Sequence, residues 1–66
     1  MTQRERILDY LRIHLDGNDD DQLAAQLNIP QRQTANRICR ELAREGLVVR
    51  RKSGLTGKLI NRLHDA

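Results

Sequence analysis

The sequence contains no Phe and no Trp, and Tyr10 is its single aromatic residue. Hydrophobic residues make up 38% of the 66 residues, so a core has to be assembled almost entirely from aliphatic side chains. A chain of this size buries little apolar surface, and we expect one marginally stable domain over residues 1–66. The scarcity of aromatic residues also disfavours single-stranded RNA as a ligand, because its recognition commonly uses aromatic stacking platforms.

Cysteine is almost absent as well. Cys39 stands alone, so it forms no internal disulfide and has no CxxC partner for zinc. We expect it to be a small core residue in a protein of the reducing cytoplasm. No apolar run approaches 18 residues and no signal-peptide pattern is present, which argues against membrane spanning and secretion. The sequence also shows no catalytic triad order and no phosphate loop, so we expect no enzyme, no cofactor and no metal site.

The net charge of +3 conceals an asymmetry along the chain. Residues 1–30 contain three Arg against six acidic residues, whereas residues 31–66 contain nine Lys or Arg against three acidic residues. A surface that only needed to be soluble would mix its charges more evenly. The split predicts a polyanionic partner on one face of the domain.

The first helix is predicted over residues 2–15. Apolar residues at positions 7, 8, 11 and 15 follow one helical stripe, and Thr2 with Glu5 fits a capping box. Residues 16–18 read as a turn, because Gly17 and Asn18 are poor strand residues. A strand here is expected to be absent or one residue pair long.

The second helix is predicted over residues 20–27, with Asp19 and Gln22 forming its capping box. The three consecutive acids suit the positive end of a helix. They make a poor metal site, because neighbouring helical side chains point in different directions. We expect Asn28 to adopt the left-handed conformation, Ile29 to enter the core and Pro30 to separate this helix from the next.

The third helix is predicted from residue 31 to residue 45, ending at Gly46. By helical-wheel geometry, one arc is apolar and faces the core: Ala35, Ile38, Cys39 and Leu42. The opposite arc is polar and predicted to face outward: Gln33, Asn36, Arg37, Arg40 and Arg44.

A β-hairpin is predicted over residues 47–63, with a glycine-containing turn at residues 53–57. Residues 58–63 also fit one face of a short helix. We prefer the strand, because a hairpin would bury Leu47 and Val49 together with Leu59 or Ile60, and a two-stranded hairpin needs such support.

Three helices followed by a hairpin, over nearly the whole chain, resemble the winged helix-turn-helix family. The residues that carry the resemblance are Leu23-Ala24 with Leu27, the Ile29-Pro30 turn, Arg40-Glu41-Leu42 leading to Glu45-Gly46-Leu47-Val48, and Gly57-Lys58-Leu59-Ile60-Asn61. The resemblance implies a mostly α fold of three helices plus a two-stranded wing.

The resemblance further implies binding to duplex DNA, with the third helix in the major groove and the wing on the backbone or in the minor groove. Arginine can donate two hydrogen bonds to guanine, and Asn or Gln can pair in the same way with adenine. The candidates for contacts with bases are therefore Gln33, Asn36, Arg37 and Arg40. Other cations suit phosphates, where they add affinity and salt dependence: Arg32, Arg44, Arg51, Lys52 and Lys58.

Two other interpretations stay open. An Arg-rich helix face is common for solubility, and Arg37 has the spacing to pair with Glu41. The alternative function is a protein-interaction winged helix within a larger assembly, which a contiguous apolar patch around Tyr10, Ile13 and Leu55 would favour. We expect either a homodimer or a fusion to a larger protein, and the absence of a dimerisation helix after the hairpin favours the fusion.

Overall fold

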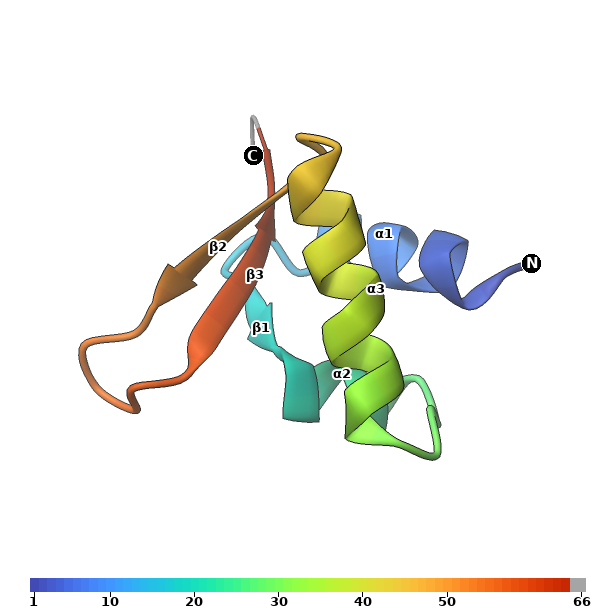
Figure 1. The fold of residues 1–66 in the computed structure, drawn as a ribbon, viewed down its shortest axis with the longest axis horizontal. Helices are drawn as coiled ribbons and strands as arrows, with labels where there is room; N and C mark the ends of the chain where they lie inside the picture. The colour runs from blue at the N-terminus through green and yellow to red at the C-terminus, as the bar shows by residue number, and fades with distance from the viewer. Residues whose placement is uncertain (65–66) are drawn as a thin grey trace.

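The computed structural model describes residues 1–64 and contains three helices and a small antiparallel sheet of three strands. In the view of Figure 1, α3 (Arg32–Arg44) lies in front of α1 (Gln3–Ile13), and the hairpin of β2 (Val48–Lys52) and β3 (Leu59–Leu63) extends to one side. The predicted domain also included residues 65 and 66, which lie outside the described residues. The elements are α1 (Gln3–Ile13), β1 (Asn18–Asp19), α2 (Asp20–Gln26), α3 (Arg32–Arg44), β2 (Val48–Lys52) and β3 (Leu59–Leu63).

Helix α1 begins one residue later than predicted, after the predicted N-cap Thr2, and ends two residues early. The Thr2 hydroxyl accepts a hydrogen bond from the Glu5 backbone N–H, and the Glu5 side chain accepts one from the Thr2 backbone, which confirms the capping box. The backbone leaves helical geometry at His14, where ψ is 78°. Leu15 therefore falls outside the helical stripe and is 51% exposed, while Ile7 and Leu11 are fully buried.

The connection from α2 to α3 follows the sequence prediction. Gln22 N donates to Asp19 Oδ1 at 2.7 Å, and Asp19 N donates to Gln22 Oε1 at 3.1 Å, so the second capping box is confirmed. Asn28 has a φ of 55°, as its left-handed role requires, and Ile29 is buried. These two residues reverse the chain after α2 and direct it into α3.

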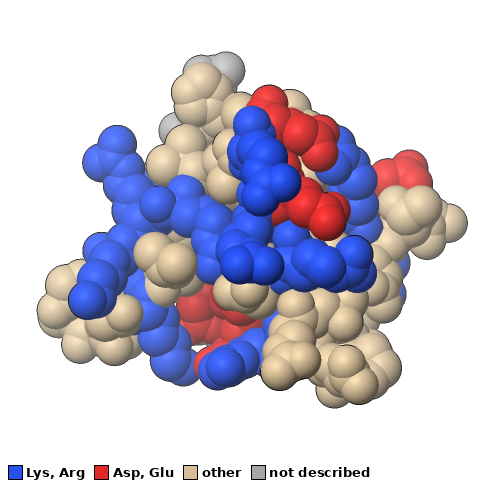
Figure 2. Space-filling view, in the orientation of Figure 1, with Lys and Arg blue, Asp and Glu red and all other residues tan. Residues whose placement is uncertain are grey.

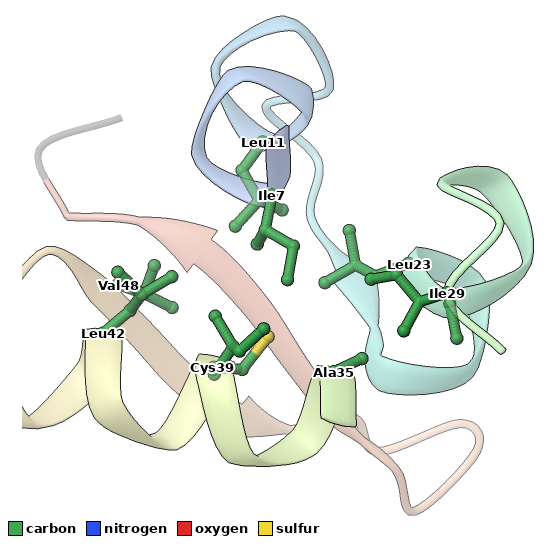
Figure 3. Close-up of a cluster of buried hydrophobic side chains, with 10 residues drawn as sticks. Ile7, Leu11, Leu23, Ile29, Ala35, Cys39, Leu42 and Val48 are labelled. Carbon is green, nitrogen blue, oxygen red and sulfur yellow. The ribbon is translucent and has the colours of Figure 1, made fainter. Parts of the chain in front are cut away.

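The core lies between the helices and one face of the sheet, and Figure 3 shows its side chains converging from all three helices. Every residue predicted for the inner arc of α3 is buried: Ala35, Ile38, Cys39 and Leu42. Cys39 is the small core residue that the sequence predicted, and burial is the main reason that its pKa rises to about 12. A thiol in this environment stays protonated.

Residues 59–63 form a strand, which decides against the short helix. β3 pairs antiparallel with β2, and β1 pairs with the other edge of β3 to give the order β1-β3-β2. Strand β1 was expected to be absent or to form a single pair, and this is wrong. It forms two pairs with β3, Asn18 with Asn61 and Asp19 with Ile60. The predicted two-stranded wing is thus part of a three-stranded sheet.

The hairpin also buries different residues from those predicted. Val48 is 2% exposed, whereas Leu47 is 42% exposed and Leu59 is 44% exposed. Leu47 still belongs to the turn after α3, since its backbone N–H donates to Leu42 O, and Val48 is the first residue of β2. Alternation along the strand then turns Arg50 inward.

Gly17 provides a test of how closely the turn approaches the sheet. Its φ is +93°, and a Cβ built there would lie 2.6 Å from Arg62 Cγ and 3.0 Å from the backbone O of Asn61. The left-handed backbone costs other residues about 1–2 kcal/mol, and overpacking adds about 1–3 kcal/mol. We therefore expect Gly17→Ala to lower the free energy of unfolding by about 2–5 kcal/mol, measured by urea denaturation.

Two other glycines separate the two contributions. Gly46 has a φ of +83° but open space around it, so Gly46→Ala should carry only the backbone cost. Gly54 has neither the positive φ nor a nearby atom, so Gly54→Ala should leave stability almost unchanged. Equal losses at all three positions would contradict this account of the turn.

Candidate nucleic-acid interface

A buried polar cluster joins both helices of the predicted helix-turn-helix to the sheet, and the Asp20 carboxylate is at its centre. Oδ2 accepts hydrogen bonds from Asn36 Nδ2 at 2.8 Å and from Arg50 Nη2 at 3.0 Å. Oδ1 accepts one from Asn61 Nδ2 at 2.8 Å. One side chain at the start of α2 therefore binds α3, β2 and β3.

The cluster is nearly closed to solvent. The side chains of Arg50 and Asp20 are only 8% and 13% exposed, and Asn61 is fully buried. Asn61 lies directly opposite Arg50 in the register of β2 and β3, and its Nδ2 also donates to Asn18 O at 3.0 Å. Because a buried charge is costly without its partner, the ion pair of Arg50 with Asp20 holds these elements in one arrangement.

The next acid, Asp21, faces two of the cations predicted to bind phosphates. Lys58 Nζ is 3.0 Å from Asp21 Oδ2, and Arg32 Nε is 3.4 Å from Asp21 Oδ1. Lys58 Nζ also lies 3.9 Å from Asp19 Oδ2. These groups belong to an open cleft between α2, the start of α3 and the hairpin, lined by Asp19, Asp20, Asp21, Arg32, Gln33, Asn36, Arg50, Lys58 and Leu59.

The outward face of α3 carries the predicted base-contacting residues in an exposed row. Gln33, Arg37 and Arg40 are exposed, as is Arg44 in the last turn. Arg37 Nη1 lies 3.8 Å from Glu41 Oε1, an exposed pair that costs little to break. Figure 2 shows basic side chains on this face over α3 and over the hairpin, with acidic side chains between them at two places.

Asn36 does not share this exposure. It is half-buried, contrary to the prediction, because its side chain turns toward Asp20 in the polar cluster. The hydrogen bond to Asp20 uses one of the two amide N–H groups, so the other N–H and Oδ1 are left for a base. Helical-wheel geometry placed Asn36 on the outer arc, and no local pattern indicated that Asp20 of α2 would be its partner.

The hairpin supplies a second group of exposed cations. Arg51 and Lys52 are exposed on β2, as predicted for phosphate contacts. Sequence reasoning missed Arg62, which is exposed on β3 opposite Val49. Since Arg51 pairs with Ile60, two residues from Arg62, the two arginines are diagonal neighbours on one face of the sheet. The alternation within β3 was the signal that could have found it.

Within residues 1–64, no group of three or more His, Cys, Asp or Glu side chains is placed to hold a metal ion. In the same part of the chain, no helix has the length and apolar character needed to cross a membrane. Comparison of the chain with protein-family models, with curated proteins and with solved structures finds no match.

The polar cluster predicts an unequal response to the loss of two aspartates. Asp20→Ala leaves Arg50 buried without its partner, which typically costs about 3–5 kcal/mol. Asp9 pairs with Arg12 on the exposed side of α1, and Asp9→Ala should cost less than about 1 kcal/mol. Urea unfolding followed by circular dichroism measures both.

A double variant tests whether the unpaired charge causes the loss. Asp20→Ala combined with Arg50→Met removes both charges of the buried ion pair and leaves neither unpaired, so it should recover part of the stability. An Asp20→Ala variant as stable as the natural chain would show that the cluster does not hold the elements together.

The contact of Lys58 with Asp21 predicts a shifted titration. The hydrogen bond from Lys58 is the main cause that holds the pKa of Asp21 below its usual range, and it raises the pKa of Lys58. In Lys58→Gln, the pKa of Asp21 should move back toward its usual value, as measured by NMR titration of the carboxyl carbon. The pKa of Glu45, which the hydrogen bond from Arg4 lowers, is the internal control and should not change.

The same pair gives a pH window for stability. A carboxyl with a lowered pKa stabilises the fold above its unfolded pKa of about 4, and this contribution disappears as the pH falls through the folded value. A lysine with a raised pKa stabilises the fold below about pH 10.4 and loses this contribution above it. The stability difference between the natural chain and Lys58→Gln should thus be largest between these limits and vanish in acid.

Proposed function

We propose that this chain is a winged helix-turn-helix module that binds duplex DNA. It would serve a transcriptional regulator or act as the N-terminal targeting domain of a larger protein. The observation that carries the proposal is the exposed row of Gln33, Arg37, Arg40 and Arg44 on α3, beside a hairpin with further exposed cations. In the proposed complex, α3 enters the major groove and the hairpin lies along the backbone or the minor groove.

The dimensions of α3 support this arrangement. Its 13 residues span about 20 Å, and a helix about 10–12 Å in diameter fits a major groove about 12 Å wide. The buried arc of α3 fixes its rotation, because Ala35, Cys39 and Leu42 pack fully into the core. The polar arc is therefore presented outward in a constant orientation.

The exposed residues divide into two roles by chemistry. Gln33, Arg37 and Arg40 are proposed to contact base edges, and Asn36, which Asp20 orients, is proposed to contact them through its second N–H and its Oδ1. The cations at the ends of this surface are proposed to contact phosphates, which position the protein without selecting sequence. These are Arg32, Arg44, Arg51, Lys52, Lys58 and, added from the structure, Arg62.

The function is tested by binding to a random-sequence duplex across a salt series. We expect a dissociation constant in the micromolar range or tighter at low salt, with affinity falling steeply as salt rises. Arg37→Ala with Arg40→Ala should weaken binding at least about tenfold and flatten the salt dependence, because both cations face the groove.

A control pair removes the same charge from another surface. Arg4 pairs with Glu45, and Arg12 pairs with Asp9, both from α1. Arg4→Ala with Arg12→Ala should change duplex binding much less than the pair on α3. Absence of salt-dependent binding by the natural chain, or equal loss in the two pairs, would rule out recognition through α3.

A second candidate function is contact with a protein partner, and one observation favours it. Ile13 is 75% exposed and Leu15 is 51% exposed, and both line one shallow hollow at the end of α1. Leu55, at 98% exposure, belongs to the turn of the hairpin, whereas Tyr10 stacks on His14 with 4.1 Å between ring centroids. If the partner is a second copy of this chain, sedimentation equilibrium should detect a dimer. The double variant Ile13→Ser with Leu15→Ser should then be monomeric.

A further inference from the structure

Asp21 is set apart from its two neighbours by what its side chain contacts. Asp19 caps α2, and Asp20 holds the buried polar cluster. The Asp21 carboxylate makes neither kind of contact: its partners within the described residues are Lys58 at 3.0 Å and Arg32 at 3.4 Å. Beyond the favourable place of an acid in the first turn of α2, the fold uses Asp21 neither as a cap nor in the buried cluster.

Both partners stand where the proposed complex needs positive charge. Arg32 begins α3, and Lys58 directly precedes β3 at the return of the hairpin. A phosphate between the helix and the hairpin would approach these two cations. In the free protein, the Asp21 carboxylate already lies beside these two cations.

The cleft as a whole carries no net charge. Its three cations, Arg32, Arg50 and Lys58, are matched by the carboxylates of Asp19, Asp20 and Asp21. By contrast, Arg40, Arg44, Arg51, Lys52 and Arg62 form no ion pair with any other residue in the range 1–64. The attraction for a polyanion is thus concentrated on the outer part of α3 and on the hairpin, and it is weakened at the cleft.

We propose that Asp21 is an intramolecular competitor of DNA: its carboxylate competes with DNA phosphates for Arg32 and Lys58 and so weakens binding to duplexes of any sequence. This inference rests on the proposed function. Phosphates are the same in every sequence, so this competition lowers the affinity for all duplexes and carries no sequence preference of its own.

The three side chains are exposed to solvent, so their ion pairs cost little to break. Asp21 is 41% exposed, Lys58 is 53% exposed and Arg32 is 68% exposed. Ion pairs in such surroundings contribute little to stability, since water screens them. A phosphate can therefore replace the carboxylate without unfolding the cleft.

The test compares Asp21→Asn with the natural chain on a random-sequence duplex. The substitution keeps the shape of the side chain and removes its charge. We expect about threefold tighter binding at low salt, the scale set by exposed ion pairs. We also expect the slope of log affinity against log salt concentration to become more negative by about one to two, because one or two more cations reach phosphates. Asp21→Glu, which keeps the charge, should bind like the natural chain.

Two controls separate the release of Arg32 and Lys58 from a general change in charge. Asp9→Asn removes one negative charge from α1 and should leave binding nearly unchanged. In a chain that carries Arg32→Gln and Lys58→Gln, adding Asp21→Asn should give no gain in affinity over that double variant, because the two cations that it would release are missing. Thermal melting followed by circular dichroism shows that each variant is folded.

The outcomes distinguish this inference from the proposed function. Salt-dependent binding by the natural chain with no gain in folded Asp21→Asn overturns the role of Asp21 and leaves the proposed function intact. A gain that persists without Arg32 and Lys58 also overturns it. No binding by the natural chain or by Asp21→Asn overturns both. A gain that depends on the two cations supports the competition.

Discussion

The carboxylate of Asp20 is the constraint on which the arrangement of this small domain depends. It joins α2 to α3 through Asn36, to β2 through Arg50 and to β3 through Asn61. A core without Phe or Trp can pack in several similar ways, because aliphatic side chains adapt to one another. A buried charge with directional hydrogen bonds is less tolerant, and it fixes how the sheet sits against the two helices.

The sequence predicted the helices well, because their signals are local. Both capping boxes, the inner arc of α3 and the left-handed Asn28 involve residues within one or two turns of each other. Such patterns depend on helical periodicity and on hydrogen-bond chemistry that the sequence displays directly. The helix ends moved by one or two residues, since the caps can form at neighbouring positions.

The contacts between distant residues could not be predicted in the same way. Arg50 occupies an inward strand position that the hydrophobic pattern would assign to an apolar residue, and its partner Asp20 lies 30 residues earlier. This buried pair accounts for the wrong choice of inward residues in β2. For the candidate interface, the exposed cations followed from the helical wheel, while the ties of Asn36 and Lys58 to acids required the tertiary structure.

The junction of β1 and α2 has a mechanical consequence. Asp19 is the last residue of the strand and also the cap of the helix, so no linker residue separates them. β1 is hydrogen-bonded to β3, and α2 packs on α3. A load applied to β3 therefore passes through β1 directly into α2, with no linker to absorb it. In the proposed complex with duplex DNA, the spacing between α3 and the hairpin would then be set by the fold before binding.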